Sequence, residues 1–297
     1  MWQLQKNLAI LKFSFLGGLD YIWQGFILVS MQVLFQYLPG WVICLGFILF
    51  SLLFTFIVVK VCRRILPHEK LDKYKDLTAI YVNIIGVLYG IFLAFVVVAI
   101  WETNDHAKDN IKREANALGN LYRDARGLPV ADKNAIQIAI KTYIHIIIDK
   151  EWESQKNFRE CEESVSASYT LQNYITNFNP NTRKEEIIYL QMLSDLNEMG
   201  IARRIRASEN TDEMPRIIWV ILIAGAVSLI IYLGCFYIQD IWFQLWLAFG
   251  VASLIAILLF IAFDLSYPFT GSTAIPPDTF QNLLDHTIRH IDEYGVK

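Results

Sequence analysis

Charged residues are scarce in this chain and are missing altogether from four of its segments. Only 19% of the 297 residues are Asp, Glu, Lys or Arg, while 55% are hydrophobic. Soluble domains carry about 25% charged residues. The segments without any charge are 40–59, 79–101, 217–238 and 243–263. Because about 20 apolar residues cross a bilayer as a helix, the sequence excludes a single water-soluble domain and predicts four membrane-spanning helices.

Cysteine is also scarce, and the sequence lacks the common catalytic and metal-binding motifs. Its four cysteines form no C-x-x-C pair, which excludes zinc-ribbon and thioredoxin-like sites. Glycine-rich phosphate loops, nucleophile elbows and H-E-x-x-H are absent as well. His286 and His290 are one helical turn apart, and we interpret them as a solvated face. The net charge of −3 offers no basic excess for nucleic acid. We therefore expect no enzyme activity, metal site, cofactor or nucleic-acid partner.

Proline is absent from Lys75 to Arg126. Across this stretch the apolar positions continue at steps of three and four beyond the second charge-free segment, through Ala107, Ile111 and Ala115. This periodicity is typical of a helix. We predict that the second spanning helix continues out of the membrane for a total of about 75 Å, at 1.5 Å per residue.

The polar region 102–216 shows no alternating strand pattern and is predicted to be a helical bundle. One helix carries an apolar stripe from Tyr143 to Trp152. Another begins at Thr182, which forms a capping box with Glu185 because each side chain can bind a free backbone N–H. After the last spanning helix, an amphipathic tail helix follows Pro276-Pro277.

The predicted fold class is an all-α polytopic membrane protein, in which two transmembrane helical hairpins flank an extramembrane helical bundle. The segment Trp23–Leu38 is apolar but short, and it either lies in the interface or spans as part of a hairpin. The predicted regions are the N-terminal apolar or interfacial segment (1–39), transmembrane helices 1 and 2 (40–101), the extramembrane helical domain (102–216), transmembrane helices 3 and 4 (217–263) and the C-terminal amphipathic tail (264–297).

Small residues recur at four-residue steps in two spanning segments. These helix-packing candidates are Gly86, Gly90 and Ala94 in the second segment and Ala248, Ala252 and Ala256 in the fourth. Small residues let helix backbones approach closely in lipid, where no hydrophobic drive brings helices together. The spacing fits packing within one chain or packing between subunits.

Lysine and arginine in short loops favour the cytoplasmic side. The loop 60–78 carries six of them, namely Lys60, Arg63, Arg64, Lys70, Lys73 and Lys75. This places the middle domain on the opposite, periplasmic side. Basic residues also flank the middle domain, among them Arg203, Arg204 and Arg206, and they favour the reverse orientation.

No charge lies inside a spanning segment, which disfavours a proton- or ion-coupled transporter. Glu102 and Asp264 each follow a spanning segment directly, and both face the middle-domain side. These acids either anchor the helices at the interface or form a ring of carboxylates at a pore mouth that would select cations.

Several motifs together resemble the bestrophin-like domain family of bacterial membrane proteins, a family of unknown function. The resemblance covers about residues 60–284 and rests on the runs Tyr81–Gly90, Ala94–Val97, Trp101-Glu102, Arg113–Leu118, Leu121–Arg123, Tyr143 to Trp152, Leu196 to Arg204 and Asp264 to Phe280. It implies a bacterial inner-membrane protein and a distant likeness to bestrophins, which are pentameric anion channels. Bestrophins hold their helical domain in the cytoplasm, which conflicts with the loop charges, and the tail lacks their calcium-binding run of acids.

With this resemblance, the leading hypothesis is a homo-oligomeric ion channel lined by the second spanning helix. The oligomer would be a pentamer by analogy. Leu88, Phe92 and Val96 are one turn apart, and they either form a hydrophobic neck or face lipid or the core. Asn83 is a further pore-lining candidate. The alternative is a non-conducting scaffold or sensor, whose extramembrane domain binds a partner through the Tyr143–Trp152 stripe and the tail helix.

Overall fold

The computed structural model describes residues 38–66, 73–208, 215–236 and 238–294, and all of the regular structure in these ranges is helical. The predicted N-terminal segment therefore lies almost wholly outside the described residues. The elements are α2 (Gly40–Ile65), α4 (Lys75–Asp124), η1 (Ala125–Gly127), α5 (Val130–Ile146), the π-helical turn η2 (Ile147–Glu151), α6 (Trp152–Lys156), α7 (Glu162–Thr176), α8 (Arg183–Ser208), α9 (Arg216–Cys235), α10 (Ile241–Leu265), α11 (Asp278–Asn282), the π-helical turn η3 (Leu283–Ile288) and α12 (Arg289–Tyr294).

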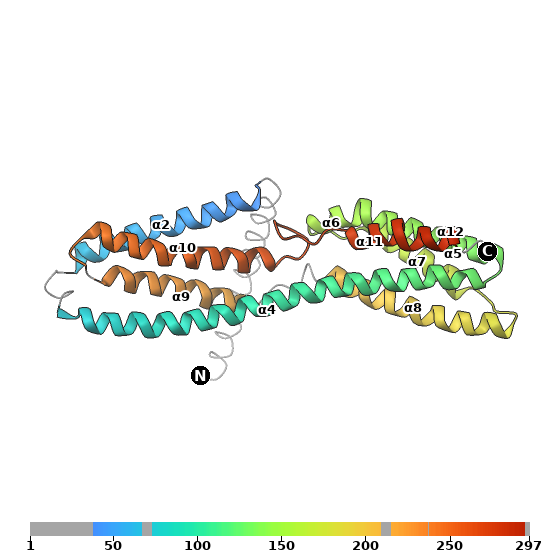
Figure 1. Cartoon of the computed structure of the whole chain (residues 1–297), viewed down its shortest axis with the longest axis horizontal. Coiled ribbons are helices and arrows are strands. Elements are labelled where there is room, and N and C mark those ends of the chain that lie inside the picture. Colours follow the sequence, from blue (N-terminus) through green and yellow to red (C-terminus); the bar gives the residue numbers. More distant parts are fainter. Residues whose placement is uncertain (1–37, 67–72, 209–214, 237, 295–297) are drawn as a thin grey trace, which may run out of the picture.

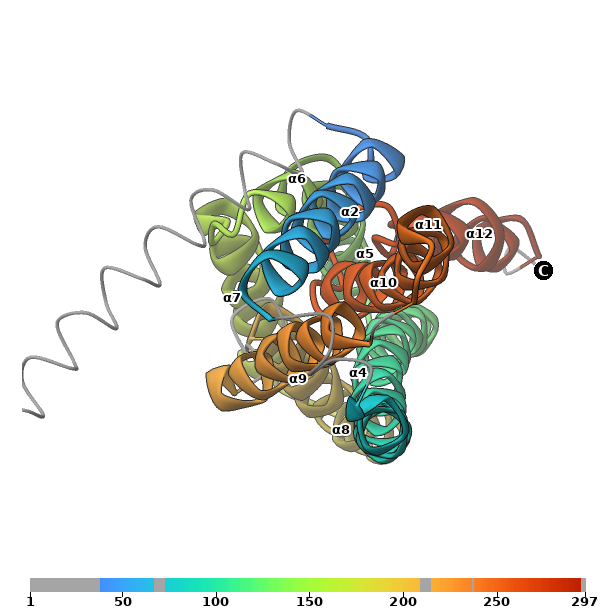
Figure 2. The same cartoon turned by 90° about the vertical axis from the view of Figure 1, so that its left-hand side faces the viewer.

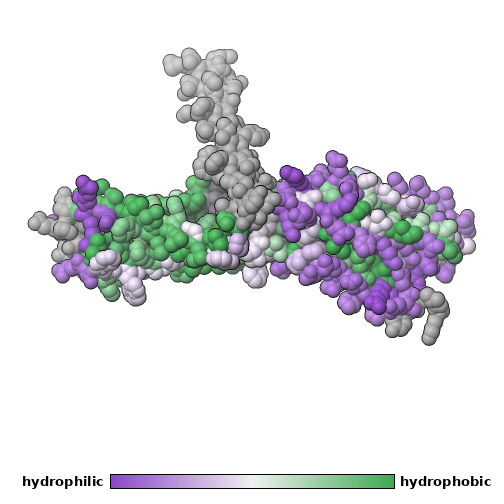
Figure 3. Space-filling view, turned by 90° about the horizontal axis from the view of Figure 1, so that it is seen from above, coloured by the Kyte–Doolittle hydropathy of each residue, from purple (hydrophilic) through white to green (hydrophobic). Residues whose placement is uncertain are grey.

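Four helices are long and apolar enough to cross a membrane: α2, α4, α9 and α10. They are the four predicted spans, and α2, α9, α10 and the first part of α4 lie together in one half of an elongated molecule (Figure 1). The surface of this half is mostly hydrophobic, whereas the other half is mostly hydrophilic (Figure 3). The prediction of two helical pairs flanking an extramembrane bundle is confirmed.

The helix α4 is 50 residues long and runs through both halves (Figure 1). It ends at Asp124, directly before the short η1 turn and Pro129. Because proline lacks an N–H and restricts the residue before it, the chain turns there. The predicted continuation of the second span out of the membrane is confirmed.

In the membrane half, α2, α9 and α10 pack together, and α4 lies at one corner against α9 and α10 (Figure 2). The contact between α2 and α9 is close at Gly234, where an added Cβ would approach Val58 Cγ1 to 2.8 Å. Further along α2, the Ser51 hydroxyl donates to the Ala252 carbonyl of α10 over 3.0 Å. Small side chains therefore set the helix spacing here, as expected in lipid.

The extramembrane half has its own hydrophobic core, which includes the C-terminal tail. The Trp152 indole N–H donates to the Ile275 carbonyl over 2.9 Å. Its ring makes edge contacts with Phe269 and Phe280, at centroid distances of 5.6 and 5.8 Å. The Tyr143–Trp152 stripe and the tail helix thus cover one another inside the domain. They do not form the open contact surface that the scaffold hypothesis requires.

The predicted capping box at the start of α8 forms with one change. The Glu185 N–H donates to the Thr182 hydroxyl over 3.3 Å, as expected. The Glu185 carboxylate accepts from the Asn181 N–H over 2.8 Å, one residue earlier than the usual partner.

The fold predicts a specific cross-link between α2 and α9. The thiols of Cys62 and Cys235 lie 3.6 Å apart, so a small movement brings the sulfur atoms to the bonding distance of about 2.05 Å. Mild oxidation of the purified protein by a disulfide reagent should join these two cysteines. Peptide mass mapping should find the linked pair.

The control variant is Cys44→Ser, which removes another half-buried cysteine of α2 and should leave the cross-link intact. Cys62→Ser should abolish it. A disulfide that instead involves Cys44 or Cys161 would contradict this arrangement of α2 and α9.

Candidate functional site

One face of α4 is uncovered along the membrane half. Its large side chains follow alternating steps of three and four residues, and each is more than half exposed: Tyr81, Ile84, Leu88, Ile91, Phe95 and Val98. This spacing keeps the side chains on one side of a helix, as in the seam of a coiled coil. We call this set the α4 stripe.

The opposite face of α4 is buried against α9 and α10. Tyr89, Leu93 and Ile100 belong to a hydrophobic cluster that includes Leu222 of α9 and Ile255 of α10. The helix is therefore covered on one side only, although the residues on both sides are apolar.

The same line continues outside the membrane as acidic residues. Glu102, Asp105 and Asp109 keep the alternating spacing after Val98, and all three are exposed. Lys112 follows in the same series and forms an ion pair with Asp109 at 2.9 Å. The exposed line that begins with the α4 stripe thus changes from apolar to acidic side chains near Trp101, which is itself exposed.

The predicted neck residues do not all lie on the uncovered face. Asn83 is exposed, Leu88 is 62% exposed, and Phe92 is partly buried beside the hydrophobic cluster. Val96 is only 7% exposed and packs inside that cluster. Four-residue steps turn by about 40° each on a helix with 3.6 residues per turn, which explains why Val96 faces the chain interior.

The two predicted pore-mouth acids have different surroundings. Glu102 is exposed on the line of the α4 stripe. Asp264 is 1% exposed at the end of α10. Its carboxylate accepts from the Ser272 N–H over 3.1 Å and from the Ser272 hydroxyl over 2.6 Å. In this chain Asp264 therefore holds the turn that leads from α10 to the tail.

The small-residue stripes also differ. Ala248, Ala252 and Ala256 of α10 are buried inside the chain. On α4, Gly86 is half-buried, while Gly90 and Ala94 are exposed. A Cβ at Gly90 would meet nothing within 4 Å. The three small residues of α10 thus pack within one chain. Of the three on α4, Gly90 and Ala94 remain open to another contact.

A buried ion-pair network in the extramembrane half was not predicted from the sequence. The Arg206 side chain of α8 is 0% exposed. Its Nε donates to Glu114 Oε2 over 2.6 Å, and its Nη2 donates to Glu114 Oε1 and to Glu151 Oε2, each over 3.1 Å. The hydroxyls of Tyr143 and Ser164 donate to Glu114 and Glu151 over 2.7 and 2.6 Å. The network therefore joins α4, α5, η2, α7 and α8.

The charges in this network stabilise one another. Burial alone would raise the pKa of Glu151, but the Arg206 charge and the hydrogen bonds from Ser164 and Arg206 outweigh it, so the pKa is lowered. Burial opposes the charge of Arg206 too, yet Glu114 and Glu151 hold its pKa well above the ordinary value. The guanidinium also lies 5.7 and 5.8 Å from the ring centres of Trp152 and Phe280. Both pKa directions keep the Arg206–Glu151 pair ionised near neutral pH.

The sequence does contain a signal for this network. Glu114 lies three residues after Ile111 and four before Leu118, on the apolar side of α4. Arg206 follows Met199 and Ala202 on the buried side of α8. A charged residue on an apolar stripe marks a buried charge that needs a partner, although it does not identify that partner. Within the described ranges, no three His, Cys, Asp or Glu side chains are grouped to hold a metal ion.

Comparisons with known proteins agree with this architecture. The family model for the bestrophin-like domain matches residues 49–280. A crystal structure of a bacterial bestrophin homologue from Klebsiella pneumoniae, carrying a point mutation, superposes with a TM-score of 0.63 at 16% identity, over 82% of this chain and 99% of that one. A structure of the homologue phased with zinc gives a TM-score of 0.61 at 16% identity, over 84% and 98% of the two chains. Among curated proteins, no sequence matches this chain.

The buried network predicts that Arg206→Met strongly destabilises the extramembrane half. The variant leaves Glu114 and Glu151 buried without their cation, which costs about 3–5 kcal/mol in comparable sites. The apparent melting temperature in detergent should fall by at least about 6 °C. Arg204→Met is the matched control, because Arg204 is exposed on the same helix, and it should change stability by less than about 0.5 kcal/mol.

The pH dependence should follow the lowered pKa of Glu151. Its stabilising effect is complete above its ordinary pKa of 4.5 and is lost as the pH falls through the lower pKa of the folded chain. The difference in melting temperature between wild type and Arg206→Met should therefore shrink in acid. Equal losses for Arg204→Met and Arg206→Met would show that the buried pair has no special role.

Proposed function

The chain belongs to the bestrophin-like family, and we propose that it forms a homo-oligomeric ion channel whose pore is lined by α4. The supporting observation is the exposed line along α4. It consists of the apolar α4 stripe at membrane depth and continues outside the membrane as acidic side chains. The distant likeness to bestrophins, which are channels, points the same way.

A pore of this kind requires several chains. In one chain, α2, α9 and α10 pack together and α4 covers one corner of the group (Figure 2). Copies arranged around a closed axis would turn the uncovered side of every α4 toward the same line. Gly90 and Ala94, exposed in one chain, would then permit close approach between neighbours. A pentamer is the number that the resemblance implies.

The pore would narrow at apolar side chains. Leu88 lies on the α4 stripe and Phe92 at its edge, so rings of both would form a hydrophobic neck that gates by dewetting. Asn83 is exposed at membrane depth, and an amide is more favourable against water in a pore than against lipid. Val96 is assigned to packing against α9 and α10.

Outside the membrane, the path would favour cations. Glu102 would form the first ring of carboxylates, followed by Asp105 and Asp109 on the same line, and rings of acids attract cations. Asp264 would take no part in this ring, because both of its oxygen atoms bind Ser272.

The proposed location is the bacterial inner membrane, with the extramembrane domain in the periplasm. The basic loop between α2 and α4 supports this orientation, since lysine and arginine are retained on the cytoplasmic side. The likeness to bestrophins favours the reverse placement, so the orientation needs its own test.

Purified protein in planar bilayers should conduct ions, and Phe92→Ala should raise the conductance. Removing the ring widens the proposed neck and lowers the barrier to its wetting. The matched control is Phe50→Ala, because Phe50 is an exposed aromatic residue on a different spanning helix, α2. Under a KCl gradient, a cation-selective pore gives a reversal potential different from zero. Glu102→Gln should move this potential toward zero, because it removes the proposed first ring of carboxylates.

The mass in detergent is measured on the same samples. A complex of several 34.3 kDa chains is expected. Failure of an intact oligomer to conduct would favour the alternative of a non-conducting scaffold or sensor. Equal conductance changes for Phe92→Ala and Phe50→Ala would remove α4 from the pore.

Cys161 reports the side of the membrane. It is a half-buried free cysteine at the start of α7. In a variant that keeps only this cysteine, a membrane-impermeant maleimide should label intact cells with a permeabilised outer membrane. A second variant with Lys73→Cys as the only cysteine should be labelled only after lysis of the inner membrane. The reverse pattern would place the extramembrane domain in the cytoplasm.

A further inference from the structure

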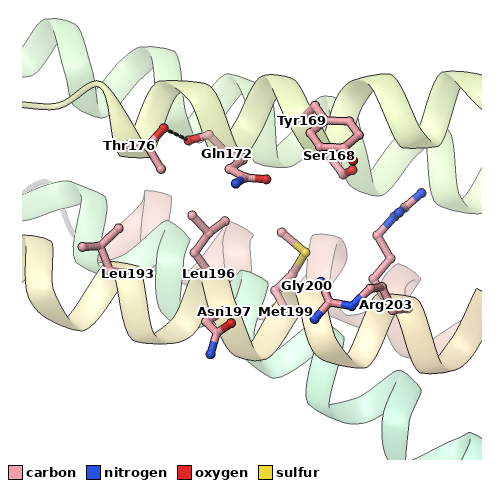
Figure 4. A pocket seen from close by; sticks show the side chains of 11 residues that line it. Ser168, Tyr169, Gln172, Thr176, Leu193, Leu196, Asn197, Met199, Gly200 and Arg203 are labelled. Carbon is pink, nitrogen blue, oxygen red and sulfur yellow. Dashed lines mark hydrogen bonds between the residues drawn. The ribbon is translucent and has the colours of Figure 1, made fainter.

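A cavity of about 500 Å³ lies between α7 and α8, outside both the α4 stripe and the buried network. Its volume falls within the range of small-molecule sites, about 300–1,000 Å³. Figure 4 shows the two helices facing each other across it. Ser168, Gln172 and Thr176 come from α7, and Leu193, Leu196 and Met199 come from α8.

The two walls differ in chemistry, and one end is cationic. The α7 wall offers hydroxyl and amide groups, whereas the α8 wall combines the apolar Leu193, Leu196 and Met199 with Asn197. Arg203 and Arg204 line the same cavity, and its lining contains no Asp or Glu. A ligand with an apolar body and one negative charge would match the apolar side chains of α8 and the cationic end.

Arg203 is available for such a ligand. Its Nε is buried and has no hydrogen-bond partner. Its Nη2 reaches only the Ser164 hydroxyl, at 3.4 Å. Within the described residues neither Arg203 nor Arg204 forms an ion pair, although the chain pairs Arg183 with Glu186 at 2.7 Å on the surface of the same helix. Arg203 itself lines the cavity, whose lining offers its guanidinium no carboxylate, and an anion bound at this end would supply one.

We propose that this cavity binds a small amphipathic monoanion, with its carboxylate on Arg203 and its aliphatic body along Leu193, Leu196 and Met199. From Ser168 to Thr176 the α7 wall advances by eight residue steps, or about 12 Å, which suits a medium-chain carboxylate. The site is distinct from the proposed pore, and its occupancy does not depend on ion conduction.

The cavity is connected to α4 through the buried network. The Ser164 hydroxyl accepts a hydrogen bond from Arg203 and donates one to Glu151. Arg206 then links Glu151 to Glu114 of α4. A head group on Arg203 would change the surroundings of Ser164. The ligand site is therefore placed to act on the long helix from the extramembrane side.

The test is calorimetric titration of octanoate into the full-length protein in nanodiscs, with empty nanodiscs subtracted. Saturable binding is expected, and Arg203→Gln should weaken it at least tenfold, because a charge-assisted hydrogen bond is lost. Octan-1-ol, which has the same body without the charge, should show no saturable binding. Arg183→Gln is the matched control on the same helix and should bind octanoate as the wild type does.

A second variant guards against misfolding of Arg203→Gln. Leu193→Gln places a polar group in the apolar wall and should also weaken octanoate binding, with the melting temperature of each variant measured alongside. Unchanged affinity in Arg203→Gln, or equal binding of octan-1-ol, would overturn the proposal. The absence of saturable octanoate binding would overturn it as well. If Leu193→Gln in that case also lowers the oligomer mass, a neighbouring chain fills the cavity.

Discussion

The helix α4 remains unbroken while its surroundings change from hydrocarbon to water, and the rest of the chain is arranged around this constraint. Inside lipid, each backbone N–H and C=O needs a partner, which a continuous helix supplies. Outside, the same helix needs a buried face to stay ordered. Among the described elements, only α4 contributes residues to both hydrophobic clusters, Tyr89 to Ile100 in one and Ala107 to Tyr122 in the other. It therefore fixes the two halves relative to each other.

The two halves are held together by different forces. The membrane half gains nothing from moving apolar surface out of water, so close approach at positions such as Gly234 and Ala252 provides the packing. The extramembrane half has an ordinary apolar core, crossed by the Arg206–Glu114 pair. A buried pair is seldom more stabilising than apolar residues of the same size. Its value here is alignment: the apolar stripes of α4 and α8 would fit in several registers, whereas Arg206 meets Glu114 in only one.

The sequence was sufficient for the helices and insufficient for their contacts. The four spans and the length of α4 follow from local features, namely charge-free runs and a proline-free apolar periodicity. The four-residue steps from Leu88 to Phe92 and Val96 do not keep these side chains on one face, because each step turns by about 40°, and Val96 is buried within one chain. The burial of Asp264 depends on Ser272, in a turn that no periodicity describes. The Arg206–Glu114 pair joins residues 92 positions apart, and local patterns show only that each needs a partner.

The geometry also limits how the proposed channel could open. The α4 stripe and Glu114 belong to one continuous helix, but they lie in different halves and on different faces. A lone helix of this length would bend easily, yet α4 is held by α9 and α10 at one end and by α8 at the other. A shift of α8 would therefore reach the α4 stripe through Arg206 as a rotation or tilt of the whole helix. Leu88 and Phe92 point about 40° apart around the helix axis. A rotation of α4 by this angle would therefore turn Phe92 toward the proposed pore axis in place of Leu88, without breaking any backbone hydrogen bond.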